Sequence, residues 1–382
     1  MTDQNYQKPY KIREALDGFL RSKEKTSGSG NYRRNAERVI TSWIEWLAAR
    51  EPPIETFDGL SVLAMRQWAR TLAARVHNDE ITASSAETYY GYIRAYLSWC
   101  VDEELLGQNP AEKRRATAEL PKDTSSGSDQ QFWQPDDRRQ LMEHVTDRAT
   151  SAIDERGMDA LAETRDRAIV AILTYSLARA GELFQARYDD RRQGLQWTDI
   201  DLSNATIRVL GKSQRVERAP LFEQAHHPLS QYRKVLDPPT DDWPVFPTRD
   251  APTLCRVART QLADDHDLTT TEIESVLEDT TCEDVVREWE LTPPSITTEG
   301  ARSILRRICA AAKIDVEGDP LYLQPHGARR GGGDALYRKK SPAEAQRALR
   351  HQDPQTTSKA YSHIEAGEVA TDNSDVFEDA DE

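Results

Sequence analysis

A stretch of ten residues without an apolar side chain, 122–131, divides the chain in two and restricts its fold more than any other feature. Its small and polar composition is typical of an interdomain linker. A chain of 382 residues is long enough for two or three domains with substantial cores. The sequence therefore predicts an N-terminal domain over residues 8–121, a second domain over 132–364 and a tail over 365–382.

The N-terminal part has the apolar spacing of helices. One amphipathic face is formed by Ala36, Val39, Ile40, Trp43, Trp46 and Leu47. The run Ser84-Ser85-Ala86-Glu87 has the pattern of a capping box that opens a helix through Trp99, and Asn109-Pro110 closes it. Aromatic residues recur at helical spacing in this part, and we expect most of them to lie in its core.

The second part combines helices with two short β-rich arms, around residues 207–210 and 218–221. The Gly-Lys-Ser-Gln sequence between these arms favours a β-hairpin with Lys212 at its tip. Ser341-Pro342-Ala343-Glu344 predicts the start of a helix that ends at His351. The predicted fold class is mainly α with a small β-sheet.

Six basic or hydroxyl side chains follow one another in local contexts that suggest a common purpose: Arg179, Lys212, His326, Arg329, His351 and Tyr361. Arg179 precedes Glu182 by three residues, which would let the carboxylate orient the guanidinium. His326 and Arg329 have the same spacing on a first helical turn. Each motif alone is also typical of ordinary surface pairs. Together the six could grip, attack and release one phosphodiester without a metal ion.

This order resembles that of the tyrosine recombinases, or phage integrases, which include the Xer-type enzymes. The resemblance covers residues 133–364 and rests on Arg-x-x-Glu, a hairpin Lys after Gly, His-x-x-Arg, and a second His followed by two threonines and a Tyr. It implies an N-terminal core-binding (SAM-like) domain that clamps the duplex, followed by a mixed α/β catalytic domain. Three features depart from the family pattern: Ala178, Arg350 in place of Gly before the second His, and the consecutive glycines 331–333.

The resemblance also implies a reaction. Tyr361 would attack the scissile phosphate and form a 3′-phosphotyrosyl link, with no cofactor, metal or ATP. Arg179 and Arg329 would hold the nonbridging oxygens. Lys212 would protonate the leaving oxygen, and His351 would donate a hydrogen bond to the phosphate. His326 would accept the tyrosine proton or help to hold the phosphate. The partner would be double-stranded DNA, bound by a homotetramer on paired sites.

The net charge of −15 conflicts with DNA binding, which positive charge favours. The acidic residues are unevenly placed, since residues 261–292, within a predicted helical insertion over about 250–292, hold eleven of them against one Arg. Arginines outnumber lysines about threefold, a composition that resembles proteins of salt-loving, haloarchaeal organisms. At molar salt the Debye length falls to about 3 Å, so repulsion between distant charges is screened. An acidic protein that does not bind DNA is the alternative interpretation.

Several arginines are candidates for phosphate contacts, although solvated surface is an alternative for each of them. They are Arg33 and Arg34 in the first part and Arg302 and Arg306 in the second. Arg38, Arg66, Arg70 and Arg307 are further candidates.

The cysteines, the apolar runs and the tail of the chain limit its function further. The four cysteines, Cys100, Cys255, Cys282 and Cys309, have neither zinc-site spacing nor the pattern of a disulfide framework. No signal pattern or apolar run near twenty residues is present, so we expect a cytoplasmic protein without a membrane partner. The acidic tail has the composition of a disordered segment. A non-cleaving DNA-binding regulator on the same fold and a type IB topoisomerase-like enzyme are the alternatives to a recombinase.

Overall fold

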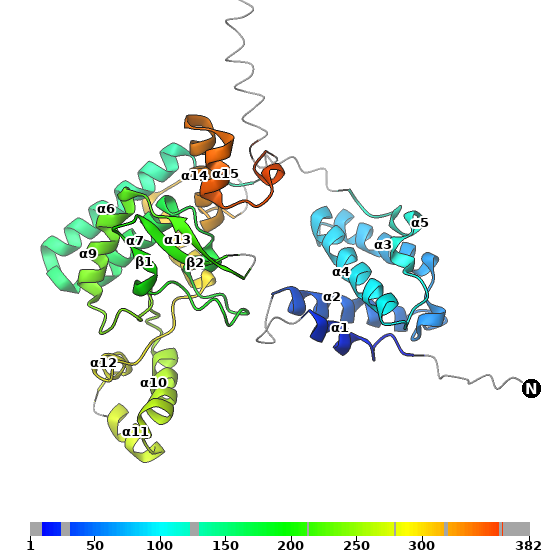
Figure 1. The fold of residues 1–382 in the computed structure, drawn as a ribbon, viewed down its shortest axis with the longest axis horizontal. Coiled ribbons are helices and arrows are strands. Elements are labelled where there is room, and N and C mark those ends of the chain that lie inside the picture. Colours follow the sequence, from blue (N-terminus) through cyan, green and yellow to red (C-terminus); the bar gives the residue numbers. More distant parts are fainter. Residues whose placement is uncertain are drawn as a thin grey trace, which may run out of the picture. The chain divides into compact units, whose positions relative to one another are not determined.

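A computed structural model describes residues 10–23, 31–122, 130–211, 214–278, 280–316, 320–358 and 361. The chain divides into two compact units, Met1–Ser126 and Gly127–Glu382 (Figure 1). Lys212, most of the predicted linker and the acidic tail lie outside the described residues. The fold is mainly helical with one small sheet, so the predicted fold class is confirmed.

Unit 1 is built from helices packed around one core. They are α1 (Leu16–Ser22), α2 (Asn31–Ala48), α3 (Val62–His77), α4 (Ala83–Asp102) and α5 (Arg114–Thr117). Thr82 caps α4 by accepting a hydrogen bond from the backbone N–H of Ser85 at 3.1 Å. The capping box predicted at Ser84 was therefore wrong, because a better cap lies two residues earlier in the sequence. Asn109 caps the 3₁₀ turn Pro110–Glu112 in the same way.

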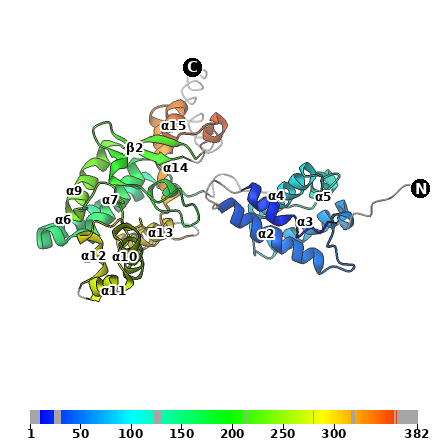
Figure 2. The same cartoon turned by 60° about the horizontal axis from the view of Figure 1, so that its bottom comes forward.

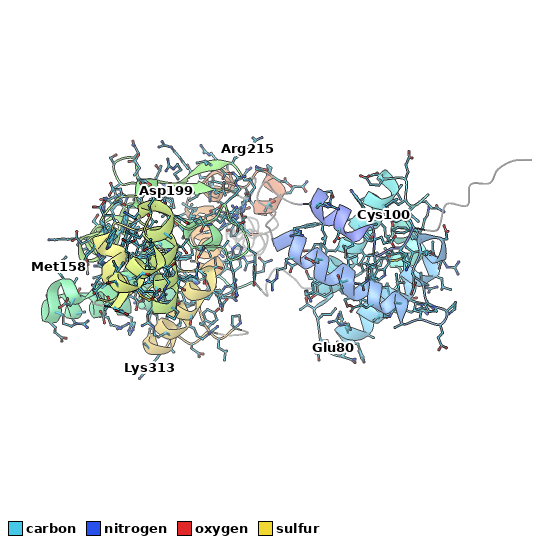
Figure 3. The ribbon with its side chains drawn as sticks, turned by 90° about the horizontal axis from the view of Figure 1, so that it is seen from below. Glu80, Cys100, Met158, Asp199, Arg215 and Lys313 are labelled. Carbon is cyan, nitrogen blue, oxygen red and sulfur yellow. A yellow bond between two sulfur atoms is a disulfide. The ribbon has the colours of Figure 1, made fainter. Side chains whose placement is uncertain are left out.

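The predicted amphipathic face of α2 is buried at Ala36, Val39, Ile40, Trp43 and Leu47. Tyr96 also lies in this core, where its hydroxyl donates to the backbone carbonyl of Ile12. Cys100 is packed among the same side chains (Figure 3). Burial of the aromatic side chains is what one face of a helical bundle requires, so the aromatic spacing reflects packing.

Unit 2 contains ten α-helices among its described residues. They are α6 (Pro135–Arg156), α7 (Leu161–Tyr175), α8 (Ala180–Leu183), α9 (His226–Leu236), α10 (Ala251–His266), α11 (Thr270–Glu278), α12 (Cys282–Glu288), α13 (Thr298–Ala312), α14 (Pro325–Lys339) and α15 (Pro342–Leu349). The second half of helix α7 is buried on every side from Ala168 to Thr174, and the helix contacts α6, α9, α13 and α14. An all-round apolar helix is buried, so α7 forms the centre of this unit.

The sheet has the order β1-β2-β3 and is antiparallel throughout. Strands β2 (Thr206–Leu210) and β3 (Val216–Pro220) form the predicted hairpin, with Leu210 opposite Val216. Strand β1 (Ile200–Asp201) was not predicted, because two residues carry too short a pattern to recognise. The hairpin extends from the body of unit 2 next to α15 (Figure 2).

The acidic insertion forms α10, α11 and α12, which lie at the end of unit 2 remote from α15 (Figures 1 and 2). Apolar residues of α10 and α12, among them Leu254, Ala258 and Val285, join the main core of the unit. Cys255 and Cys282 form a disulfide between these two helices. The sequence analysis missed this bond, because a separation of 27 residues has no recognisable pattern. No helix in the described parts of the chain is long and apolar enough to cross a membrane.

Candidate active site

Arg179 and Glu182 form the pair that their spacing predicted, but not on the apolar helix before them. Helix α7 ends at Tyr175, and Leu177 adopts a positive φ of 52° in the turn that follows. Arg179 is the N-cap of the short helix α8. Its backbone N–H donates to Glu182 Oε2 at 2.8 Å and its Nη1 to Oε1 at 2.9 Å. The carboxylate is fully buried, whereas 29% of the Arg179 side chain is exposed, so a ligand can reach the guanidinium.

Arg329 is the second arginine of the site and is the fifth residue of α14, which begins with Pro325. Only 3% of the residue is exposed. Its Nη1 donates to the carbonyl of Leu177 and its Nη2 to the carbonyl of Leu349, at the end of α15. Burial, and then the charge of Arg179, lower the pKa of Arg329 to about 9. Arg329 therefore ties the turn before Arg179 to the last residue of α15.

The two histidines lie near these arginines, and their charged forms are disfavoured. His351 Nδ1 is 2.9 Å from Thr357 Oγ1, which belongs to the second of the two threonines in the predicted motif. Burial, and then the charges of Arg329 and Arg179, lower the pKa of His351 to about 4. Partial burial of the ring, and then the charges of Arg330 and Arg329, lower the pKa of His326 to about 4, although the residue is exposed at the start of α14. Both rings are neutral at pH 7 and able to accept a proton.

Tyr361 lies inside the protein, with 1% of the residue exposed. Its hydroxyl donates to the carbonyl of Arg330 at 3.3 Å, and its ring packs against Phe132 and Tyr337. Burial raises the pKa of the phenol to about 12, although the charge of Arg329 opposes the shift. The phenol is therefore neutral and closed off from solvent in this conformation.

The three consecutive glycines of α14 allow three close approaches. A Cβ at position 331 would clash with the backbone of Trp133, and one at 332 with the Leu177 side chain. A Cβ at Gly333 would clash with the Tyr361 hydroxyl. Glycine costs about 1 kcal/mol against Ala in a helix, and here the contacts that only glycine permits offset that cost. This departure from the family pattern is thus part of the packing around the site.

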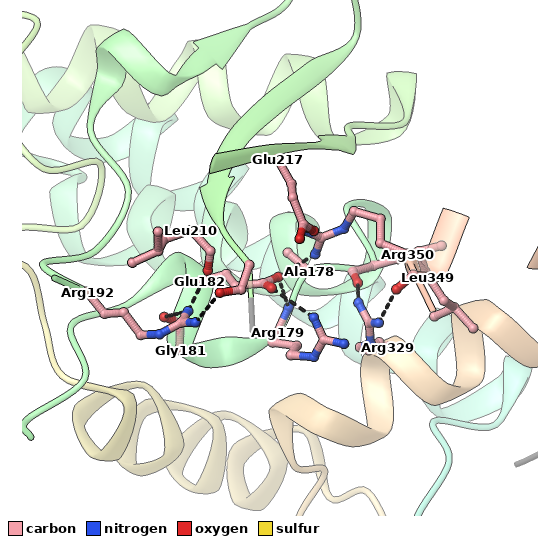
Figure 4. A network of polar contacts seen from close by, with 12 residues as sticks. Ala178, Arg179, Gly181, Glu182, Arg192, Leu210, Glu217, Arg329, Leu349 and Arg350 are labelled. Carbon is pink, nitrogen blue, oxygen red and sulfur yellow. Dashed lines mark hydrogen bonds and ion pairs between the residues drawn. The ribbon is translucent and has the colours of Figure 1, made fainter. Parts of the chain in front are cut away.

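Arg350, the second departure, adopts the left-handed conformation with φ 54° and ends α15. Gly reaches this region without strain, whereas another residue is disfavoured there by about 1–2 kcal/mol. The Arg350 guanidinium donates from Nη2 to Glu182 Oε2 at 2.5 Å and from Nη1 to Glu217 Oε2 at 3.0 Å (Figure 4). The side chain that replaces glycine therefore joins two carboxylates at the centre of the site.

Arg192 is a site residue that the sequence analysis missed. Its Nη1 donates to the carbonyls of Gly181, at 3.1 Å, and Leu210, at 2.6 Å, while Nη2 donates to Gly211 at 2.7 Å (Figure 4). These bonds fasten the end of β2 to α8. Arg192 Nε donates to the nearby carboxylate of Asp189 at 3.2 Å, which is an ordinary local pair. The sequence carries no signal of the other role, because the three carbonyl acceptors come from elsewhere in the chain.

The residues predicted to contact DNA have other contacts in the structure. Arg302 is exposed and pairs with Glu299 at 3.4 Å, and Arg306 stacks on the ring of Tyr322. Arg307 donates two hydrogen bonds to the buried carboxylate of Asp166, at 2.9 and 2.8 Å. Arg307 is therefore a structural residue.

The arginines proposed in unit 1 differ in their exposure and in their contacts. Arg34 is exposed and Arg33 half-buried. Arg66 and Arg70 both donate to the carboxylate of Glu119, which holds the pKa of that carboxyl below its ordinary value.

Comparison with known proteins places the chain in a class. The model of the phage integrase family matches residues 135–368, more than half of the chain. The chain therefore belongs to the phage integrase family, the tyrosine recombinases, as its motifs predicted. A haloarchaeal source, which its composition suggested, stays a prediction.

Two curated relatives are tyrosine recombinases named XerC. The protein of Corynebacterium glutamicum is 24% identical over 237 residues, which cover 61% of this chain and 65% of that protein. The protein of Pseudomonas fluorescens is 25% identical over 214 residues, which cover 55% of this chain and 59% of that protein. The matched region thus spans less than two thirds of these relatives.

Solved structures share the fold. The Tn1549 transposon integrase in complex with circular intermediate DNA has a TM-score of 0.56 at 13% identity, covering 92% of this chain and 95% of that one. A lambda integrase dimer bound to a COC′ core site has a TM-score of 0.53 at 14% identity, covering 92% of this chain and 77% of that one. At such low identity, the likeness concerns the fold alone.

Proposed function

We propose that the protein is a site-specific DNA recombinase that cuts and rejoins DNA strands through a 3′-phosphotyrosyl intermediate. The observation that carries this proposal is the convergence of Arg179, Arg329, His326, His351 and Tyr361. They come from separate segments, yet the charge of Arg179 acts on the pKa values of His326, Arg329 and His351, and the charge of Arg329 acts on that of Tyr361. A cluster of guanidiniums, neutral imidazoles and one phenol suits attack on a phosphodiester better than any other common reaction.

The arginines supply the electrostatic part of the reaction. Arg179 is held by a buried carboxylate and remains open to solvent, so its fork can bind the nonbridging oxygens of a phosphate. Arg329, which is buried, would supply a second guanidinium to the same phosphate. Negative charge grows on these oxygens in the transition state, and fixed donors at that point stabilise it.

Proton transfer falls to His326 and Lys212. The Tyr361 oxygen bonds to phosphorus while its proton passes to His326, and the bond to the 5′-oxygen breaks as that oxygen takes a proton from Lys212. A phenol with a pKa of about 12 needs such a base at neutral pH. Since its hydroxyl donates to the carbonyl of Arg330, Tyr361 must leave this contact before it attacks. The role of Lys212 rests on the family motif.

Duplex DNA is the proposed partner, bound by a homotetramer in the cytoplasm. The solved relatives include integrase–DNA complexes and a lambda integrase tetramer bound to a Holliday junction. Unit 1 would serve as the clamp on the duplex. The net charge of −15 opposes DNA binding at low ionic strength, and we therefore expect binding to tolerate concentrated salt.

The decisive experiment is a search for an adduct that resists SDS. Nicked duplexes from the DNA flanking the gene are incubated with the protein in concentrated KCl with EDTA. We expect an adduct with the wild type and with Tyr337→Phe, the neighbouring phenol, and none with Tyr361→Phe, which should still bind DNA. Binding without an adduct by the wild type would favour the non-cleaving regulator instead. Relaxation of plasmids without a second site would favour a topoisomerase.

A further inference from the structure

Arg350 lies at the centre of the site, although it has no role in the proposed reaction. Its guanidinium joins three segments: α8 through Glu182, β3 through Glu217, and the end of α15, from which His351 follows directly. Figure 4 shows the side chain between the two carboxylates, with Arg179 and Arg329 beside them.

The Arg350 contacts are shielded from solvent. Only 10% of its side chain is exposed, against 0% for Glu182 and 28% for Glu217. Its Nε has no hydrogen-bond partner among the residues that the structure describes. Ion pairs that are buried in this way have a fixed geometry, unlike exposed pairs, which exchange freely with water.

Glu182 connects Arg350 to the phosphate-binding group. Its Oε2 accepts from both the Arg179 backbone N–H and Arg350 Nη2, while its Oε1 accepts from Arg179 Nη1. Arg350 therefore helps to fix the plane of the carboxylate, and that plane sets the direction of the Arg179 guanidinium. Burial alone would raise the pKa of Glu182, but Arg350 and the Arg179 contacts hold it below its ordinary value, so the carboxylate stays charged.

A second connection runs through the backbone. Leu349, the residue before Arg350, gives its carbonyl to Arg329 Nη2. The two phosphate-binding arginines are thus tied to neighbouring residues at the end of α15, Arg329 directly to Leu349 and Arg179 through Glu182 to Arg350. In a protein with glycine at position 350, only the backbone tie would remain.

We propose that Arg350 is a positioning residue for the phosphate site: it holds Glu182 so that Arg179 faces the scissile phosphate, and it fixes β3 to the turn that carries His351. This inference rests on the proposed recombinase activity. Arg350 itself touches no reacting atom, because both of its Nη groups are occupied by carboxylates.

A substrate with altered charge separates this role from a general loss of structure. Arg179 acts on the negative charge of the nonbridging oxygens, and a methylphosphonate at the scissile position replaces one such oxygen with an uncharged methyl group. A variant in which Arg179 is misdirected should therefore be slow on phosphate and nearly normal on methylphosphonate. A variant that is merely damaged should be slowed equally on both substrates.

Four variants are compared in single-turnover adduct formation with nicked duplexes of each kind. Arg350→Gly removes the bridge and keeps the left-handed backbone. Arg350→Lys keeps the charge but has no planar fork, and Glu217→Gln removes one of the two carboxylates. Lys313→Gly is the control, because Lys313 also ends a helix of unit 2 in the left-handed conformation, with φ 53°.

We expect Arg350→Gly to form the adduct at least about tenfold more slowly than the wild type on phosphate, and within about twofold of it on methylphosphonate. Arg350→Lys and Glu217→Gln should show the same pattern with smaller losses, and they decide the question if Arg350→Gly does not fold. Lys313→Gly should match the wild type. Equal losses on both substrates, or no loss, would overturn the role of Arg350 alone. A wild type that forms no adduct would overturn the recombinase proposal, and the role of Arg350 with it.

Discussion

The hydroxyl of Tyr361 lies against the Cα of Gly333, so closely that no side chain fits between them. The proposed nucleophile is therefore also a core residue, packed with Leu177, Tyr337 and Leu349 in a small apolar cluster. Departure of the phenol from this position would open that cluster. The last glycine of the run in α14 is a determinant of where the phenol rests.

Gly333→Ala should displace Tyr361 from this position. We expect the pKa of the phenol to fall from about 12 toward its ordinary value, because burial is the main cause of the shift. Overpacking should cost about 1–3 kcal/mol, less the gain from alanine in a helix. The difference in absorbance titration between this variant and its Tyr361→Phe derivative measures the pKa. Gly91→Ala, in the helix interior of α4 with open space around it, should instead stabilise the protein. An unchanged phenol titration would contradict this account.

Arg179→Ala and Arg329→Ala should both abolish efficient cleavage yet differ in stability. Loss of either guanidinium should slow adduct formation by about 10²–10³-fold. Arg179→Ala leaves Glu182 paired with Arg350, so the unfolding free energy should change little. Arg329→Ala removes both hydrogen bonds to the Leu177 and Leu349 carbonyls and should lower it by about 2–3 kcal/mol. Thermal unfolding and single-turnover rates of the two variants test this difference. Equal stabilities of the two variants would refute it.

Acid should destabilise unit 2 through His351. Its pKa is about 4 in the folded protein, below the ordinary value of about 6.5, so the unfolded chain binds more protons in between. The unfolding free energy should therefore fall as pH decreases from about 6.5 to about 4. Urea unfolding at a series of pH values measures this slope, and His351→Gln should reduce it. A bound phosphate analogue such as vanadate should raise the His351 pKa, because it offsets the charges of Arg329 and Arg179. An NMR titration that shows no rise would place the anion elsewhere.

Arg307→Ala and Arg302→Ala, two changes on α13, should differ in what they affect, the first lowering stability and the second weakening DNA binding. Arg307 satisfies the buried carboxylate of Asp166, whose remaining partners Arg148 and Arg165 lie at 3.6 and 3.8 Å. Its loss should cost about 1–2 kcal/mol of stability, discounted because the Arg307 side chain is 49% exposed, and should leave DNA affinity unchanged. Arg302→Ala should be neutral for stability and should reduce the slope of log affinity against log salt by about 0.9. An unchanged slope for Arg302→Ala would remove it from the DNA contacts.

Reduction of the Cys255–Cys282 disulfide should loosen the acidic insertion without affecting catalysis. The bond closes a loop across 27 residues, and its loss should cost about 3 kcal/mol of local stability. Faster hydrogen exchange in α10 and α12 under reducing conditions, with the adduct yield unchanged, is the expected result. Cys255→Ser should behave like the reduced protein. Exchange rates that do not respond to reductant would show that packing alone holds these helices.

Sequence reasoning was most successful where one local pattern determines one element. Helix α15 begins at Pro342 after the cap Ser341, as the sequence predicted, and Arg179 and Glu182 are close because three residues separate them. The order of the motifs was enough to identify the family. Whether all six predicted site residues act as proposed stays a prediction, since Lys212 lies outside the described residues.

The relationships that escaped sequence reasoning join distant parts of the chain. Arg350 meets Glu182 across 168 residues, and Arg192 meets Gly211 across 19. From the sequence alone, the three glycines of α14 are poor helix formers. The structure explains them, because each lies against a close neighbour: Trp133, Leu177 or Tyr361. Such contacts depend on tertiary packing, which leaves no periodic trace in the sequence.

The burial of Arg329 makes its positive charge a source of instability in the folded protein. Its guanidinium stays charged near Arg179 and Arg350 although burial and both neighbours oppose that charge. A bound phosphodiester would bring a compensating negative charge to this point and so favour the folded state by mass action. The substrate would then act as a missing structural component, and the melting temperature of the catalytic unit would depend on whether DNA is present.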